Sequence, residues 1–484
     1  MNKKRVAFES LGCKLNYAET VQIEKEFRQR GFDVVDSSTS ADVLVINTCT
    51  VTHNADSDCR QIVRRALRTS PEAFVVVTGC YAQGKPEEVA GIEGVDLVLG
   101  AKEKFNLFDY VGDLKKDNGS NFGSHEVDLK ENYHARVFAG PINEAIEFGP
   151  ADSADPSTRL HAGTPDSSRA AIGSKPTGLR ARTRAFLKVQ DGCNYTCSYC
   201  TIPKVRGVSR SPSVASLVDE AKVIASLGYK EVVLSGVNVG DFAGAHHGAG
   251  AQIFDGRRDK NSFLNLLTEL ENVDGIERIR ISSIEPNLLT KEIVRFVAFS
   301  TKYCKHFHVP LQSGSDEVLK RMRRRYNSSQ YREIVGYIRE VMPNAGIGAD
   351  VIVGFPGETG ECFEDSYSFI EDLPLTYMHV FTYSERDGTD AVRFDRVVDQ
   401  KIRKKRSEIL RMLSVQKRYE FSRRHIGRIM KVLVEEEIKN GKMFGLTSNY
   451  IRVEMDSNPS KANEICDVLI TGVSDNSLTG QVIL

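Results

Sequence analysis

The sequence predicts an α/β protein with three folded parts: a small parallel-sheet domain, a partial α/β barrel and a small all-β barrel. Residues 1–112 and 182–390 alternate short apolar runs with stretches at helical spacing, which is typical of parallel sheets covered by helices. Residues 427–484 carry strand-like runs and little helical pattern, as small β-barrels do. A chain of 484 residues is long enough for several such parts.

The amino-terminal part is expected to place three cysteines at one edge of its sheet. The expected strands are Arg5–Leu11, Asp42–Asn47 and Phe74–Thr78. The expected helices are Tyr17–Gly31 and Ser57–Thr69. Cys13, Cys49 and Cys80 each follow the carboxyl end of one of these strands. One such cysteine alone would be interpreted as a buried core residue. Three at the same position favour a ligand site, because ligands converge outside the carboxyl ends of parallel strands.

A polar stretch separates the first part from the second. Residues 113–181 are rich in Gly, Ser, Asp and Pro and poor in aromatic residues. Such a composition buries too little apolar surface to offset the loss of chain entropy on folding. We therefore expect a linker or partly disordered insertion, interrupted by one short strand at Arg136–Ala139.

The central part is expected to be a partial barrel of six βα units, whose site lies at the carboxyl ends of its strands. The expected strands are Ala185–Gln190, Glu231–Ser235, Arg278–Ser282, Phe307–Pro310, Gly346–Val353 and Met378–Tyr383. The expected helices are Ser213–Leu227, Phe263–Glu271, Lys291–Ser300, Asp316–Arg321, Ser329–Val341, Glu361–Asp372 and a long one at Asp399–Arg424. The domains are thus expected at residues 1–112, 182–424 and 425–484.

Composition and cysteine use narrow the class of protein. The 40% hydrophobic and 27% charged residues exclude a collagen-like or wholly disordered chain. The start, MNKKRVAFESLGC, carries no long apolar targeting segment, and no apolar run is long enough to span a membrane. We therefore expect a cytoplasmic protein without membrane contact, in which clustered cysteines indicate metal binding or catalysis.

Three of the ten cysteines form a tight group in DGCNYTCSYCTIP. Structural zinc requires four ligands, and no fourth partner stands at a suitable spacing from Cys193, Cys197 and Cys200. Three thiolates suit a 4Fe-4S cluster that leaves one iron open to chelate S-adenosylmethionine. Tyr199 would then pack against the adenine of that cofactor. The alternatives are a chance cluster or a redox dithiol.

At this point the sequence resembles a known family. CNYTCSYC resembles the radical S-adenosylmethionine signature, and LGCKLNYAE, INTCTVT, VTGCYAQ and GFPGET are similar to motifs of the methylthiotransferases. The branch that acts on N6-threonylcarbamoyladenosine at position 37 of tRNA is the most similar. The terminal β-domain resembles the TRAM module, which is associated with RNA binding.

This resemblance implies a radical enzyme that converts the threonylcarbamoyladenosine to its 2-methylthio derivative. It implies two 4Fe-4S clusters, the auxiliary one held by Cys13, Cys49 and Cys80 and supplying the sulfur. It also implies two molecules of S-adenosylmethionine, one as methyl donor and one as source of the 5′-deoxyadenosyl radical. The expected partners are a tRNA anticodon stem-loop and an electron-donor protein, and we expect a monomer. Alternatives are action on isopentenyladenosine in tRNA, action on an aspartate of a ribosomal protein, and an RNA-binding iron–sulfur sensor without turnover.

Further candidates for cofactor contact stand near the ends of the central strands. They are Gly236, Asn238, Ser283, Glu285, His308, Gln312, Asp350 and Glu358. For each of these an ordinary structural role at the end of a strand or in a loop is the alternative. Arg206 and Arg210, just beyond the cysteine loop, are expected to contact either the carboxylate of S-adenosylmethionine or the RNA backbone. Cys59, Cys304, Cys362 and Cys466 match no motif, and we expect structural roles for them.

Local charge points to an RNA surface that the net charge of zero conceals. Residues Lys401–Lys431 contain twelve Lys or Arg and two Glu, and clustered bases neutralise phosphates without regard to sequence. A solvated helix face is the alternative. The candidate RNA-binding residues are Arg321, Arg323, Arg324, Arg325, Lys404, Lys405 and Arg406. Residues 427–484 carry eight acids against six bases, so shape and loop contacts are expected there.

Overall fold

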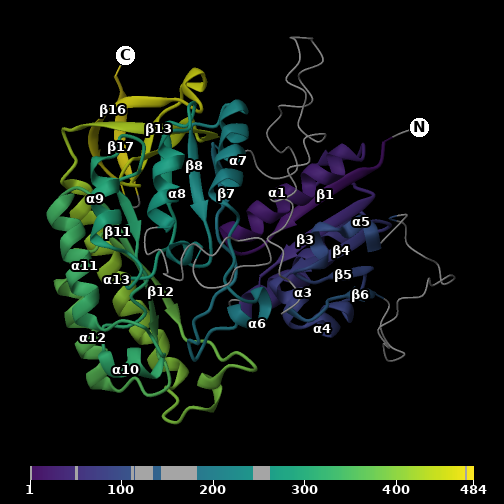
Figure 1. Cartoon of the computed structure of the whole chain (residues 1–484), viewed down its shortest axis with the longest axis horizontal. Helices are drawn as coiled ribbons and strands as arrows, with labels where there is room; N and C mark the ends of the chain where they lie inside the picture. The colour runs from purple at the N-terminus through teal and green to yellow at the C-terminus, as the bar shows by residue number, and fades with distance from the viewer. Residues whose placement is uncertain are drawn as a thin grey trace.

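The computed structural model describes residues 3–49, 53–110, 114, 135–142, 183–243, 262–474 and 477–483. Most of the expected linker therefore lies outside the described residues. Three parts are visible in Figure 1: an amino-terminal sheet with its helices, a central barrel, and a small β-barrel near the carboxyl terminus. Within the described residues, no helix is long and apolar enough to cross a membrane.

The amino-terminal part is one parallel sheet of six strands in the order β2-β1-β3-β4-β5-β6. The strands are β1 (Arg5–Ser10), β2 (Asp33–Val35), β3 (Val43–Thr48), β4 (Phe74–Gly79), β5 (Leu97–Leu99) and β6 (Arg136–Phe138). The helices are α1 (Lys14–Gln29), α2 (His53–Thr69), α3 (Cys80–Gly84), α4 (Pro86–Ala90), η1 (Glu103–Phe105) and α5 (Leu107–Tyr110). Strands β2 and β5, of three residues each, were not predicted.

The short strand expected inside the linker belongs to this sheet. Strand β6 pairs in parallel with β5, with Val98 opposite Val137. The sheet thus extends past the expected boundary at residue 112. Strand β5 would otherwise be the edge of the sheet, with unpaired backbone groups. A strand that follows a long connection can still pair with such an edge.

Period-two alternation builds a core on each side of this sheet. On one face, Phe8, Val45 and their neighbours pack against Phe27 of α1. On the other face, Leu44 and Val77 pack against α2 and α4. Strands β3 and β4 are buried throughout, as expected of central strands in a sheet covered on both faces.

The central part is a six-stranded parallel barrel that stays open between its first and last strands. Two sheets, β7-β8-β9 and β10-β11-β12, are joined by parallel bridges between Ile279 and Tyr303 and between Ser283 and His308. The strands are β7 (Arg184–Lys188), β8 (Glu231–Ser235), β9 (Arg278–Ile281), β10 (His306–His308), β11 (Gly346–Val353) and β12 (Tyr377–Thr382). The predicted partial barrel is confirmed.

Helices cover the outside of this barrel. They are α6 (Ile202–Arg206), α7 (Val214–Ser226), η6 (Val239–Asp241), α8 (Ser262–Glu271), α9 (Lys291–Phe299), α10 (Asp316–Arg321), α11 (Ser328–Val341), α12 (Gly360–Asp372), η7 (Asp390–Arg393) and α13 (Gln400–Arg423). Alternate strand residues such as Leu187, Val232 and Ile279 point outward into one apolar core beneath these helices. The intervening residues therefore line the inside, and many of them are polar or charged.

The carboxyl-terminal part is a closed five-stranded barrel in the order β13-β14-β15-β17-β16. Its elements are β13 (Ile429–Lys439), β14 (Lys442–Thr447), β15 (Arg452–Asp456), η8 (Pro459–Lys461), β16 (Ile465–Val473) and β17 (Leu478–Val482). It lies at the amino-terminal ends of the central strands (Figure 1). Arg278, the first residue of β9, donates hydrogen bonds to the carbonyls of Leu446 and Thr447, each over 2.8 Å. The opposite end of the central barrel is therefore the one that faces the cysteine loops.

Candidate active site

The amino-terminal cysteines lie at the carboxyl ends of three adjacent strands. Cys13 precedes α1, Cys49 follows β3, and Cys80 begins α3 directly after β4. Strands β1, β3 and β4 are neighbours in the sheet, so the three thiols share one edge. Gly12 adopts a φ of +92°, and a Cβ there would lie 2.6 Å from the sulfur of Cys49. Glycine is required at this position, because the loop of Cys13 passes directly over Cys49.

Burial keeps the thiol of Cys80 protonated in the absence of a cation. The pKa of Cys80 is raised to about 12, chiefly by burial and further by the nearby Cys13 and Cys49, while Arg206 opposes the rise. Three close thiols in this setting become thiolates together only if positive charge compensates them. Iron ions supply such charge, so the donor set fits an iron–sulfur cluster.

The central cysteines lie in the loop that connects β7 to α6. The backbone N–H of Cys193 donates to the Gly207 carbonyl over 3.0 Å, and the N–H of Tyr195 donates to the Cys193 sulfur over 3.4 Å. Burial raises the pKa of Cys193 to about 11 and that of Cys200 to about 12. These thiols, too, require a compensating cation to act as ligands.

Arg324 brings positive charge to this second triplet. Its guanidinium donates to the sulfur of Cys197 over 3.1 Å and pairs with the carboxylate of Glu285. A guanidinium stabilises a thiolate directly, since it is always charged. Glu285 and Arg324 therefore meet beside the loop, although the sequence assigned them separately to cofactor and RNA.

Neither triplet is arranged as a site for a single ion. Among the described residues, His308, Asp350 and His379 are the only three metal-ligand side chains whose donor atoms all lie within 4.8 Å of one another. The cysteine sulfurs are spread more widely, as the corners of a cluster require. In the His–Asp–His group, Nε2 of His308 and Nδ1 of His379 lie 3.0 and 3.2 Å from the same Asp350 oxygen. Both imidazoles thus share one carboxylate oxygen, an arrangement that needs no ion.

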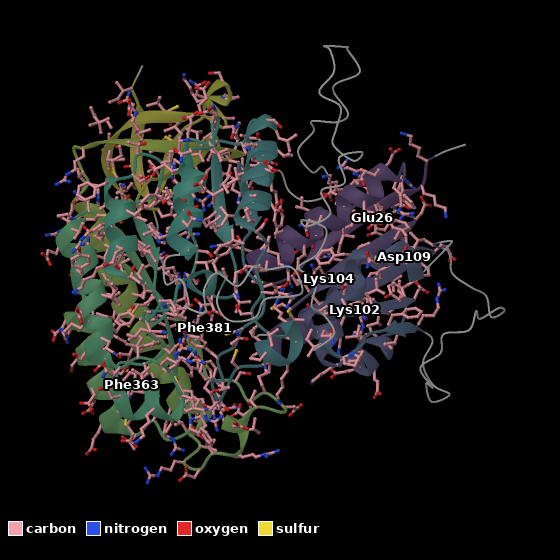
Figure 2. All side chains as sticks on the ribbon, in the orientation of Figure 1. Glu26, Lys102, Lys104, Asp109, Phe363 and Phe381 are labelled. Atoms are coloured by element: carbon pink, nitrogen blue, oxygen red, sulfur yellow. The ribbon has the colours of Figure 1, made fainter. Side chains whose placement is uncertain are left out.

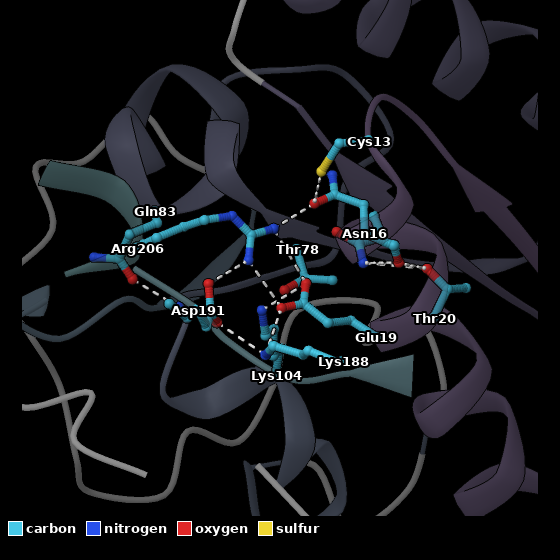
Figure 3. Close-up of polar contacts among 12 residues, drawn as sticks. Cys13, Asn16, Glu19, Thr20, Thr78, Gln83, Lys104, Lys188, Asp191 and Arg206 are labelled. Carbon is cyan, nitrogen blue, oxygen red and sulfur yellow. Dashed lines mark hydrogen bonds and ion pairs between the residues drawn. The ribbon is translucent and has the colours of Figure 1, made fainter. Parts of the chain in front are cut away.

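A buried guanidinium connects the two triplets (Figure 3). Arg206 donates to Oδ1 of Asn16 over 2.5 Å, to Glu19 over 3.0 Å and to Asp191 over 2.9 Å. Asn16 lies one helical turn after Cys13, and its Oδ1 is 3.7 Å from the Cys13 sulfur. Asp191 stands two residues before Cys193. One side chain thereby joins the loop of each triplet.

Two buried lysines, Lys104 and Lys188, complete this interface. Glu19 is fully buried and lies 2.8 Å from Nζ of Lys104 and 3.1 Å from Nζ of Lys188. Lys104 lies where the amino-terminal part meets the central barrel (Figure 2). Burial opposes ionisation of Glu19, but Arg206 and the two lysines hold its pKa well below the usual range. Buried charges of this kind are tolerated only when they are paired and hydrogen-bonded.

Arg206 and Arg210 contact protein groups in addition to, or in place of, the cofactor or RNA contacts predicted for them. Arg206 is only 3% exposed and is fully engaged by protein groups. Arg210 donates to Asp191 over 3.0 Å and to the Arg206 carbonyl over 2.6 Å. The sequence could not reveal the contact with Glu19, because that acid is 187 residues away in the chain.

The turn after β8 presents an unfilled donor to the side on which the cofactor is expected. The backbone N–H of Asn238 donates to Oε1 of Gln190 over 2.9 Å, and its Oδ1 accepts from the N–H of Glu285. Its Nδ2 is buried without a hydrogen-bond partner among the described residues. A Cβ on Gly236 would lie 3.0 Å from Gln190, so the turn packs closely. A polar cofactor group would satisfy the orphaned amide, and this fits S-adenosylmethionine.

The other predicted cofactor residues are more dispersed. Ser283 forms a backbone bridge to His308, and Gln312 adopts a φ of +65° and donates its N–H to the Asp350 carbonyl over 2.8 Å. Tyr199 packs edge-on against Phe355, with ring centroids 6.1 Å apart. These positions hold the loops at the carboxyl ends of the strands in place.

Several predicted RNA-binding cations are already paired with acids. Arg406 is buried against Glu358, 2.6 Å away, so its assignment to RNA is wrong. Arg324 is buried at the cysteine loop beside Glu285. Arg321 and Arg323 each lie 2.6 Å from an aspartate, and Arg325 stacks on Tyr195 and donates to the Asn194 carbonyl. Lys404 and Lys405 remain exposed on α13.

Other functional positions left no signal in the sequence pattern. Asn16, Glu19, Lys104, Lys188 and Asp191 build the interface between the two triplets, yet a buried charge looks like any solvated charge in a sequence. The remaining cysteines are buried, and Cys59 lies in the apolar core beneath α2.

The parts of the chain match three known families. Residues 5–100 match the uncharacterized protein family UPF0004, residues 187–370 the Radical SAM superfamily and residues 423–483 the TRAM domain. The threonylcarbamoyladenosine tRNA methylthiotransferase MtaB of Bacillus subtilis is 35% identical over 96% of this chain and 93% of its own length. Its counterpart from Aquifex aeolicus is 36% identical over 93% of this chain and 97% of its own length. The chain belongs to the radical S-adenosylmethionine methylthiotransferase family, in the MtaB branch.

The methylthiotransferase family also includes relatives of a different name. The tRNA-2-methylthio-N(6)-dimethylallyladenosine synthase of Clostridium novyi is 29% identical over 99% of this chain and 97% of its own length. Among solved structures, the radical S-adenosylmethionine methyltransferase TsrM from Kitasatospora setae shares the fold. It has a TM-score of 0.53 and 18% identity, and the match covers 81% of this chain and 77% of that one. The family assignment and the predicted fold class are therefore confirmed.

Proposed function

We propose that this protein attaches a methylthio group to carbon 2 of N6-threonylcarbamoyladenosine at position 37 of tRNA. The observation that carries the proposal is the pair of cysteine triplets held in one frame by Arg206, Glu19 and Asp191. The curated relatives that match nearly the full length and bear the threonylcarbamoyladenosine name support the substrate. The proposed reaction uses two metal centres beside one substrate, and the contacts of Arg206 hold the loops of both cysteine triplets close together.

The residues present would hold two clusters and a sulfonium cofactor. Cys193, Cys197 and Cys200 would bind the 4Fe-4S cluster of a radical S-adenosylmethionine enzyme, and the amino-terminal triplet would bind the auxiliary 4Fe-4S cluster. When bound, these groups would supply the radical activation of the adenine and the sulfur to be inserted, and S-adenosylmethionine would also supply the methyl group.

The chain itself contributes orientation and charge. Arg206 fixes the loop of Cys13 relative to the loop of Cys193, so that both centres face the same substrate. Arg324 stabilises the thiolate of Cys197. The unpaired side-chain amide of Asn238 would donate a hydrogen bond to a polar group of the cofactor. Radical transfer to the substrate depends on such fixed geometry, because a radical that is not held beside its target atom can react with another group.

The tRNA anticodon stem-loop is the proposed macromolecular partner. Exposed Lys404 and Lys405 on α13 and the TRAM barrel offer contacts to its backbone. Position 37 would have to be splayed out of the stacked loop to reach the carboxyl ends of the central strands. An electron-donor protein would supply the reductant, and the protein would act as a cytoplasmic monomer.

Mass spectrometry of tRNA nucleosides tests the proposal. Bulk tRNA from a strain that lacks this chain should contain threonylcarbamoyladenosine but no 2-methylthio derivative of it, and the gene on a plasmid should restore the product. Retention of the 2-methylthio form in the deletion strain would overturn the proposed substrate.

The second candidate substrate is dimethylallyladenosine, the isopentenyladenosine considered above. It is favoured by the relative from Clostridium novyi, whose name includes this base and which matches 99% of this chain. Reconstituted, reduced protein offered stem-loops with either modified base, or the ribosomal protein with its aspartate, separates these activities. Failure to cleave S-adenosylmethionine with all three would favour an RNA-binding sensor instead.

A further inference from the structure

The inside of the central barrel carries an excess of buried positive charge. Alternate residues of the strands point inward, and at the level of the second rung Phe186, Val233 and Arg280 stand side by side. On the other half of the barrel His308, Gly348 and Tyr377 stand side by side, and a bridge joins His308 to Ser283, three residues after Arg280. The outward neighbours of these residues are apolar and belong to the main core, so the charged residues of the strands face inward.

Three arginines from the first half of the barrel point inward, and they differ in one respect. Arg184 lies 3.0 Å from Glu435, and Arg278 lies 3.1 Å from Glu231. Arg280 is 5% exposed, yet among the described residues no carboxylate lies within ion-pair distance of it. Its Nε is buried and has no hydrogen-bond partner in the described part of the chain.

The side chain of Arg280 contacts two tyrosines, the Tyr377 hydroxyl by a hydrogen bond and the ring of Tyr450, and neither of them carries a compensating charge. Its guanidinium lies 4.0 Å from the ring centroid of Tyr450, which reaches up from the carboxyl-terminal barrel. The hydroxyl of Tyr450 donates to one carboxylate oxygen of Glu231, and the other oxygen of this acid pairs with Arg278. Burial and the nearby Arg280 lower the pKa of His306, which therefore stays neutral. Burying an unpaired cation costs several kcal/mol, roughly, so this position calls for an anion.

Side chains inside the barrel become more exposed toward the carboxyl ends of the strands, the end that faces the cysteine loops. Asp350 is 25% exposed there and His379 is 51% exposed. At the opposite end, Tyr450 of the carboxyl-terminal barrel packs on Arg280, and Arg278 hydrogen-bonds to the Leu446 carbonyl. We therefore expect an anionic group to approach Arg280 from the side on which the substrate would be modified.

We propose that Arg280 is the binding site for the carboxylate of the threonylcarbamoyl group, and that it selects this substrate over bases with an apolar side group. The inference rests on the proposed function, because it names the part of that substrate which enters the barrel. A guanidinium binds a carboxylate through charged N–H donors, and the buried Nε of Arg280 is such a donor without a partner among the described residues. A dimethylallyl group offers no charge, and would leave the buried cation unpaired.

Binding measurements with matched RNAs test this inference. Full-length reconstituted protein is titrated with four anticodon stem-loops that differ only at position 37: threonylcarbamoyladenosine, its carboxyl methyl ester, dimethylallyladenosine and adenosine. The wild type should bind the free acid roughly tenfold more tightly than the ester, as expected for one charged pair, and Arg280→Gln should reduce this ratio to about one. Arg280→Lys should retain part of the preference.

Arg295→Gln is the control variant. Arg295 also lies over a tyrosine ring, that of Tyr337, with 5.8 Å between its guanidinium carbon and the ring centroid, but on the outer surface of the barrel. This variant should bind all four RNAs as the wild type does. Thermal denaturation of each variant shows whether the fold is intact, and the comparison of acid with ester in the wild type does not depend on any variant.

Three results would overturn the inference. They are equal binding of acid and ester by the wild type, an unchanged preference in Arg280→Gln, and an equal decrease in affinity for all four RNAs, which would indicate that Arg280 binds a phosphate. If threonylcarbamoyladenosine is methylthiolated while any of these holds, only the carboxylate site is wrong. If that base is never methylthiolated, the proposed function itself fails.

Discussion

Individual side chains in this protein take roles that depend on what surrounds them. Arg324 and Arg325 are neighbours in a basic run, but the first is buried at Cys197 and the second stacks on the ring of Tyr195. Cys59 and Cys49 lie ten positions apart, but one belongs to an apolar core and the other to the edge of the sheet where the thiols meet. The role of a side chain therefore depends on the groups that it contacts as well as on its residue type.

Substitution of the cysteines separates the two proposed clusters. The triple variant Cys13→Ala, Cys49→Ala, Cys80→Ala should lose about half of the bound iron and sulfide, and the Cys193, Cys197, Cys200 triple variant should lose the other half, because we propose that each triplet binds one 4Fe-4S cluster. Iron and sulfide analysis with visible absorption measures this. Cys59→Ala, the control from the same domain, should keep both clusters. Equal iron in wild type and either triple variant would contradict the assignment.

The helix α1 is the element on which the geometry of the site depends. It begins directly after Cys13, and within two turns it presents Asn16 and Glu19 to the central barrel. Tyr17, on the same helix, packs against Phe186 of β7 with ring centroids 5.4 Å apart. Helix, cysteine and interface are thus a single unit, so a displacement of α1 would move Cys13 relative to the central cysteine loop.

Glu19→Gln should destabilise this junction strongly. The change leaves Lys104, Lys188 and Arg206 with one acid fewer in a fully buried site, and removal of one partner from such a network costs about 3 kcal/mol or more. Chemical denaturation of the full chain measures the decrease in the free energy of unfolding. Asp219→Asn, which removes an exposed carboxylate paired with Lys222 on α7, should cost less than about 1 kcal/mol. Similar decreases in both variants would contradict the role of Glu19.

The same carboxylate predicts the direction of the pH dependence. The pKa of Glu19 lies below its unfolded value of about 4.3 because Arg206 and two lysines stabilise the charged form. Its contribution is therefore complete above about pH 5 and disappears as the pH falls through the acid range below that value. The stability difference between wild type and Glu19→Gln should accordingly shrink on acidification below about pH 4.

The whole molecule presents fewer free cations than its sequence suggests. Helix α13 contributes most of the basic residues between Lys401 and Lys431, but Arg403 and Arg406 turn inward to Glu385 and Glu358. These two anchor α13 to the central barrel, and the exposed lysines between them face solvent. A count of charges along a helix therefore overstates the surface available to RNA.

Reversal of the exposed charges should weaken tRNA binding without changing base selectivity. Lys404→Glu with Lys405→Glu should lower affinity for every stem-loop to the same degree, and should reduce the slope of log affinity against log salt by about one for each phosphate that the variant no longer neutralises. Fluorescence titration over a range of salt concentrations measures both. Lys291→Glu, at an exposed site on α9, is the control and should leave the slope unchanged. An unchanged slope in the double variant would place the RNA elsewhere.

The sequence by itself determined the order of the elements, the six-stranded central barrel, the closed terminal barrel and the grouping of six cysteines in two sets. These follow from patterns within short windows: period-two apolar runs, helical spacing, and cysteines at the ends of strands. Only the tertiary structure decided which charges are buried and with which partners. Arg206 meets Glu19 across 187 residues, and Arg280 meets the ring of Tyr450 from another domain. Such contacts depend on how whole elements pack, and the free energy of a charge depends on its burial and its partners, which no local pattern specifies.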